Sequence, residues 1–179
     1  MTELMHAMSV GTFVPALRSL SGVLAKGVAH AQASGADPDA LAVARLAPDM
    51  FTLAQQIDIA CYQARCGAAI LSGRELPGFE GGEASFAGFE LHIAGTIAYV
   101  EAAPEASFEG AADRPLKVPL PDAGITLEMT GLEFLRDWAL PHFYFHVVTA
   151  YDILRAGGAP IGKLDYLAHV GYAIRQGSG

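Results

Sequence analysis

The amino-acid sequence predicts an all-α protein, a four-helix bundle with a small β-hairpin between its third and fourth long helices. Four long segments repeat apolar residues at intervals of three and four, the pattern of a helix with one face against a core. Between the last two segments the apolar residues alternate at every second position, which is typical of strands. No repeat or long linker divides the 179 residues, so we expect a single domain over residues 1–179.

The first half of the chain should form two long helices with a short one between them. Apolar spacing predicts a helix over residues 2–33 and a short helix over 37–46, opened by Asp37-Pro38. The second long helix should begin at residues 47–49 and end at 72–73. Small residues on its inward side would let another helix approach closely: Ala60, Ala64, Gly67 and Ala68.

A third long helix is expected over residues 84–101, with Pro104 after it as a stop. Residues 116–120 and 125–129 alternate in polarity, and the segment 121–124 (PDAG) between them has good turn chemistry. We therefore expect a β-hairpin, which must lie on the bundle because two strands alone are marginally stable.

The last long helix should run over residues 131–157, and a short terminal helix should follow it. From Ala139 to Tyr151 it holds no Asp, Glu, Lys or Arg, so we expect it to be buried on most sides. Pro141 lacks a backbone donor, which predicts a kink, or the start of a second segment, at that point.

Two histidines four residues apart, His142 and His146, lie on the inward side of this helix. Two imidazoles at this spacing can bind one metal ion. Each ring could equally be a buried side chain that is satisfied by a carbonyl or a hydroxyl. The spacing by itself leaves both alternatives open.

The second long helix offers two polar residues, Gln56 and Asp58, at opposite margins of its inward face. Either could reach the interior of the bundle, and either could be an ordinary solvated residue. Aromatic residues near the histidines would line a ligand pocket or pack the core: Trp138, Tyr62, Tyr144, Phe143 and Phe145.

Composition excludes some classes of partner. The net charge is −8 with only 11 Lys and Arg, so binding to nucleic acid or to an acidic membrane surface is disfavoured. Hydrophobic residues make up 52% of the chain and charged residues 17%, which indicates a large core or a face covered by a second copy, as in a homodimer.

The chain holds two cysteines and an N-terminus without a basic region. Cys61 and Cys66 form no Cys-x-x-Cys motif and lie on different sides of one helix, so free thiols are expected. The start of the chain does not resemble a signal peptide, and no segment looks long and apolar enough to span a membrane. A cytoplasmic location is the expectation.

Three segments carry a family resemblance: SVGTFVPALRSLSGVLAKGVAHA (9–31), RLAPDMFTLAQQIDIA (45–60) and ALPHFYFHVVTAYDILRAGGAPIGKLDYL (139–167). Together they resemble a bacterial branch, of unknown function, of the DinB/YfiT-like metalloenzyme superfamily. The resemblance covers nearly the whole chain, and residues 167–179 look like a C-terminal extension beyond it.

The resemblance implies an up-down-down-up four-helix bundle that is often a homodimer. In the wider superfamily a divalent metal, commonly nickel or zinc, is held by one His early in the second helix and by two His on the last bundle helix. Characterised relatives include thiol-dependent S-transferases and maleylpyruvate isomerases.

His142 and His146 match the paired histidines of that pattern, but the second helix departs from it. No His occurs between His30 and His92, so Gln56 or Asp58 would have to supply the third ligand. A carboxylate is an acceptable ligand for zinc, nickel or manganese, and an amide is a poorer one. The site could therefore be degenerate or hold no metal.

Three functions remain open from the sequence. The first is a small-molecule-binding protein that keeps the fold without a working metal site. The second is a divalent-metal-dependent enzyme of the S-transferase or isomerase type, with the metal bound by His142, His146 and Asp58. The third is a structural or partner-binding homodimer.

Overall fold

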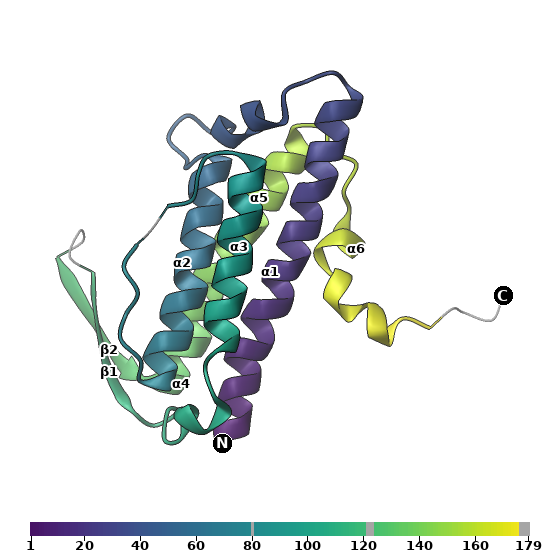
Figure 1. Cartoon of the computed structure of the whole chain (residues 1–179). Helices are drawn as coiled ribbons and strands as arrows, with labels where there is room; N and C mark the ends of the chain where they lie inside the picture. Colours follow the sequence, from purple (N-terminus) through teal and green to yellow (C-terminus); the bar gives the residue numbers. More distant parts are fainter. Residues whose placement is uncertain (80, 121–123, 176–179) are drawn as a thin grey trace.

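The computed structural model describes residues 1–79, 81–120 and 124–175. Its four long helices are α1 (Thr2–Ala33), α2 (Leu53–Ser72), α3 (Phe86–Glu101) and α5 (Leu140–Ala156). Helices α1 and α2 each pack against both α3 and α5, so α1 and α2 lie diagonally across the bundle. Helices α1 and α5 run in one direction and α2 and α3 in the other (Figure 1), which confirms the predicted up-down-down-up bundle.

Long connections follow from this order. Because α2 and α3 are parallel, the described residues of their connection, 73–79 and 81–85, return along the length of the bundle before α3 begins (Figure 1). The segment between α1 and α2 holds the 3₁₀ helix η1 (Pro38–Val43), shorter than the predicted helix over 37–46. Asp39 in η1 accepts a hydrogen bond from the backbone N–H of Phe86 (2.8 Å), which ties this connection to the start of α3.

Helix α2 begins later than predicted, at Leu53 rather than at residues 47–49. Thr52 and Gln55 form a capping box, in which each side chain accepts a hydrogen bond from the other residue's backbone N–H. These two bonds satisfy the backbone N–H groups of Thr52 and Gln55, which have no acceptor within the first turn of the helix, so they set its start. Helix α3 likewise begins at Phe86, after the cap residue Ser85, rather than at residue 84.

The predicted last helix has three parts: α4 (Gly131–Glu133), the π-helical turn η4 (Phe134–Ala139) and α5. Pro141 lies in the first turn of α5, immediately after η4. Because proline lacks an N–H and crowds the preceding turn, the hydrogen-bond pattern changes at that point. The prediction that Pro141 marks a change in the helix is confirmed.

The hairpin consists of β1 (Pro115–Leu120) and β2 (Ile125–Thr130), paired antiparallel from Pro115↔Thr130 to Leu120↔Ile125. Its inner side chains Leu116, Val118 and Met129 pack against the bundle core, as predicted. Of the predicted turn, residues 121–123 lie outside the described part of the chain.

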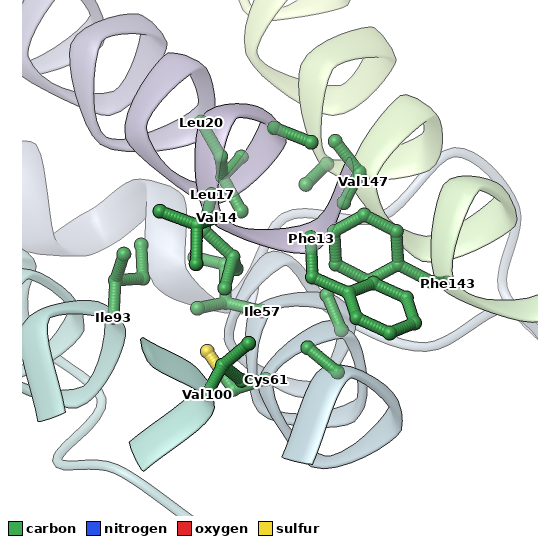
Figure 2. Close-up of a cluster of buried hydrophobic side chains, with 14 of the residues drawn as sticks. Phe13, Val14, Leu17, Leu20, Ile57, Cys61, Ile93, Val100, Phe143 and Val147 are labelled. Atoms are coloured by element: carbon green, nitrogen blue, oxygen red, sulfur yellow. The ribbon is translucent and has the colours of Figure 1, made fainter. Parts of the chain in front are cut away.

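The core draws on all four long helices. Figure 2 shows Phe13, Val14 and Leu17 of α1 facing Ile57 and Cys61 of α2, Ile93 and Val100 of α3, and Phe143 and Val147 of α5. The rings of Phe13 and Phe143 meet edge to face, 5.0 Å between centroids. Cys61 and Cys66 are both buried free thiols, as predicted. Burial raises the pKa of the Cys61 thiol to about 12, so this sulfur is unreactive at neutral pH.

Two features of the chain ends differ from expectation. The terminal helix is split into α6 (Lys163–Tyr166) and the 3₁₀ helix η5 (Ala168–Ala173). By length and composition α1 is apolar enough to cross a membrane, contrary to the expectation from the sequence. In the structure 56% of its most apolar window is buried, which is the pattern of a core helix.

Candidate functional site

The two helices α2 and α5 bring Gln56 and His146 together. The side-chain atoms Gln56 Oε1 and His146 Nδ1 are 2.6 Å apart, and the two residues are only 1% and 3% exposed. Gln56 Nε2 donates to the backbone carbonyl of Phe51 (3.4 Å), so Oε1 is the amide atom turned toward His146. His146 Nδ1 must then be the donor, which leaves the lone pair of this ring on Nε2.

His142 lies one turn before His146 on the same face of α5. The two imidazole centroids are 5.1 Å apart, and the rings are tilted by 41°. Within the described part of the chain, His142 Nδ1 is buried and has no hydrogen-bond partner. A buried nitrogen without a partner is costly, so this atom is the part of the site most suited to an added ligand.

Burial keeps both imidazoles neutral. It lowers the pKa of His142 below the usual value for histidine. For His146, burial and then the neighbouring charge of His142 lower the pKa to about 4. At neutral pH the site therefore holds two uncharged rings with lone pairs available for a proton donor or a cation.

The structure places Asp58 away from the histidines, on the side of α2 that faces α3. Its Oδ1 accepts a hydrogen bond from the backbone N–H of Gly82 (2.8 Å) and lies 3.9 Å from His92 Nε2. Two residues along a helix turn the side chain by roughly 200°, so Gln56 and Asp58 cannot face the same neighbour. Asp58 thus binds the loop before α3 and does not join the histidine pair.

The predicted pocket aromatics divide in the same way. Trp138 packs edge-on against His142 (5.1 Å between centroids), and Phe145 packs edge-on against His146 (5.2 Å) while remaining 58% exposed. Tyr62 instead packs against Phe79.

The other two predicted pocket aromatics, Tyr144 and Phe143, pack against each other, with 5.4 Å between their ring centroids. Tyr144 lies near Tyr166, and Phe143 belongs to the core. Only Trp138 and Phe145 flank the histidines.

The side chains near the histidines supply fewer metal ligands than a divalent metal site needs. Catalytic zinc sites use three protein ligands, and structural sites use four. Gln56, His142 and His146 offer two imidazoles and one amide oxygen, and the oxygen is already engaged by His146 Nδ1–H. Over residues 1–79, 81–120 and 124–175 no group of three His, Cys, Asp or Glu side chains is arranged so that it could hold a metal ion. These residues do not fit a three-ligand catalytic centre.

Two contacts made by the predicted site residues were not expected from the sequence. The Phe51 carbonyl that orients Gln56 gave no signal, because a backbone group has none in the sequence. The pairing of Asp58 with His92 joins α2 to α3 across a loop, and only the direction of each side chain around its helix could have suggested it.

Comparison with known proteins places this geometry in a class. A solved structure, described as a crystal structure of a DinB family member protein from Shewanella denitrificans, matches with a TM-score of 0.84 and 36% sequence identity, covering 93% of each chain. The fold is thus that of a DinB-like helical-bundle protein. No curated protein matches the chain.

The family assignment is more specific. A family described as "Domain of unknown function (DUF1993)" matches residues 5–167. The chain belongs to this DinB-like family of unknown function, and the resemblance inferred from its sequence is confirmed.

Proposed function

We propose that this protein is a small-molecule-binding bundle in which the family's metal site is degenerate. The proposal depends on one observation, the hydrogen bond between Gln56 and His146. This bond engages the amide oxygen of Gln56, the side chain that would have to supply the third metal ligand. An amide is also a poorer metal ligand than an imidazole. What is left is a buried polar pair beside two aromatic rings, a combination common in ligand pockets.

A ligand at this site would meet two kinds of group. His142 Nδ1 offers one unmatched hydrogen-bonding position, among the residues that the structure describes. Trp138 and the exposed Phe145 offer aromatic faces on either side of the histidines. Because both imidazoles are neutral, a polar uncharged ligand suits the site better than an anion.

Metal binding is the direct test. Trp138 is the only tryptophan of the chain and touches His142, so its fluorescence reports on the site. We expect protein purified without a His tag to carry less than about a tenth of an equivalent of transition metal, since two ligands hold a metal weakly. Titration with nickel, zinc or manganese should give no saturating change at one equivalent. A stoichiometric change that is lost in His142→Ala would overturn the proposal.

A divalent-metal-dependent S-transferase or isomerase is the second candidate. One observation favours it: His146 Nδ1–H donates to Gln56, and such outer hydrogen bonds commonly orient metal-binding histidines. In this candidate, the third metal ligand would have to come from a residue other than Gln56, His142 and His146. The same titration separates the candidates, because this one requires tight binding of one metal per chain.

We also propose that the protein forms a homodimer. Leu4, Met8 and Leu132 are exposed, and with Leu135 and Leu140 they line an apolar hollow between the start of α1 and the start of α5. Exposed apolar surface of this kind is typical of self-association. Sedimentation at micromolar concentration should show a dimer, and a strict monomer would contradict it.

We further propose a cytoplasmic location without nucleic-acid or membrane partners, in keeping with the net charge of −8.

A further inference from the structure

A cavity lies between α2 and α3, on the side of α2 away from the histidine pair. Its volume is about 260 Å³, and its walls come from one residue of α2 and five of α3: Arg65, Leu91, His92, Gly95, Thr96 and Tyr99. The wall residues of α3 span residues 91–99, so the cavity runs for about two turns along that helix. Neither the family assignment nor the proposed function uses these residues.

One end of the cavity is cationic. The guanidinium carbon of Arg65 lies 5.2 Å from the centroid of the Tyr99 ring, and that of Arg74 lies 4.4 Å from the same centroid. Arg74 is held there because its Nη1 donates to the Tyr99 carbonyl (3.1 Å). Its Nη2 is buried and has no acceptor among the described residues. Arg65 belongs to the cavity wall at this end, whereas Arg74 stacks on the same ring outside that wall.

The rest of the cavity is apolar or small. Leu91 is exposed at the other end, and Thr96 on the floor is buried beside Cys61, to which it is hydrogen-bonded. A Cβ atom added at Gly95 would have no atom of the described chain within 4 Å, so this glycine opens directly into empty space. His92, near the Leu91 end, has a buried Nε2 with no hydrogen-bond partner in the described chain, 3.9 Å from Asp58.

We infer that this cavity binds a small organic carboxylate. Its carboxylate would lie at the Arg65 and Tyr99 end, because guanidinium groups recognise carboxylates by paired hydrogen bonds. The acidic Asp58 lies toward the opposite end and disfavours the reverse orientation. The apolar body of the ligand would extend over Gly95 toward Leu91. A volume of 260 Å³ limits the ligand to a small molecule about the size of one ring with its substituent.

Benzoate is a suitable probe, with benzamide as its neutral counterpart and inorganic phosphate as an anion without an apolar body. Binding is followed by amide NMR shifts of residues 91–99 and by calorimetry. We expect benzoate to shift these amides saturably, benzamide to bind at least tenfold more weakly, and phosphate to bind less tightly than benzoate. Equal binding of benzamide, tighter binding of phosphate, or no saturable shift with benzoate up to ten millimolar would overturn the inference.

Two glycine variants provide a matched pair. Gly95→Leu fills the cavity, whereas Gly11→Leu places the same side chain in α1, where a Cβ also has no neighbour within 4 Å in the described chain. Both should raise the thermal midpoint, because leucine favours a helix over glycine. Only Gly95→Leu should abolish benzoate binding, and Arg65→Gln should weaken it at least tenfold. Unchanged binding in either variant would contradict the inference, whatever the metal titration at His142 shows.

Discussion

At the scale of single residues, the contact between Gln56 and His146 decides what the candidate site is. A buried imidazole N–H and a buried amide oxygen satisfy each other across two helices, 90 positions apart in the chain. In the proposed function, this contact engages the side chain that would have to supply a third metal ligand. It can be tested by stability as well as by metal binding.

Removal of one partner should cost more than removal of both. Gln56→Leu leaves His146 Nδ1–H buried without an acceptor, and we expect a loss of about 1–3 kcal/mol in the free energy of unfolding. The double variant Gln56→Leu/His146→Leu removes both polar groups and should recover part of that loss. Urea denaturation of the wild type, the two single variants Gln56→Leu and His146→Leu, and the double variant gives the four values that this comparison needs. Strictly additive losses would show that the two side chains do not interact.

The lowered pKa of His146 predicts that the stability of the protein depends on pH. The pKa of His146 is lowered to about 4 in the folded protein, against an ordinary value of 6.5. The unfolded chain therefore binds a proton between these two values that the folded chain does not, and this residue lowers the stability as pH falls from about 6.5 to 4. His146→Gln should show a shallower decrease over this window. An NMR titration of His146 with a midpoint near 6.5 would contradict the prediction.

At the scale of elements, helix starts show which local signal prevails. Ala47-Pro48-Asp49 and Thr52-Leu53-Ala54-Gln55 both have helix-start chemistry, and only the second is used. A capping box satisfies two backbone donors, whereas a proline merely lacks one. The predicted start of α2 was therefore wrong because two helix-start signals lie close together in the sequence. The apolar spacing along the helix was interpreted correctly.

Two substitutions compare these signals. Thr52→Ala removes the cap of α2 and should lower the free energy of unfolding by about 1 kcal/mol. Asp49→Ala, at the start expected from the sequence, should change it by less than about 0.5 kcal/mol. Thermal unfolding followed by circular dichroism provides both values. Equal effects of the two substitutions would contradict the prediction that the Thr52 cap sets the start of α2.

At the scale of the whole molecule, the bundle order separates two regions of α2. One side of the helix faces α5 and carries Gln56, and another faces α3 and carries Asp58 and Arg65. The polar residues of one helix thus lie on two sides of it: Gln56 belongs to the histidine pair, and Arg65 lines the cavity for which we propose a carboxylate ligand. This division follows from an up-down-down-up order in which α2 contacts α3 and α5 together.

The C-terminal segment after the family match should be dispensable for folding. Helix η5 (Ala168–Ala173) has no buried residue, and the described part of the segment touches the bundle through a hydrogen bond between Ser19 and His169 (3.2 Å). We expect deletion of residues 168–179 to lower the free energy of unfolding by about 1 kcal/mol or less. Comparison of denaturation midpoints checks this, and failure of the shortened chain to fold would contradict it.

The sequence by itself determined the long helices, the hairpin and the position of the histidine pair, because periodicity and turn residues are local properties. The change at Pro141 was also predictable, since it follows from the chemistry of one residue. Only the tertiary structure decided that Gln56 meets His146 and that Asp58 meets His92. Which neighbour each face of α2 contacts depends on how four helices pack together, and that is a sum of many distant contacts which no local pattern records.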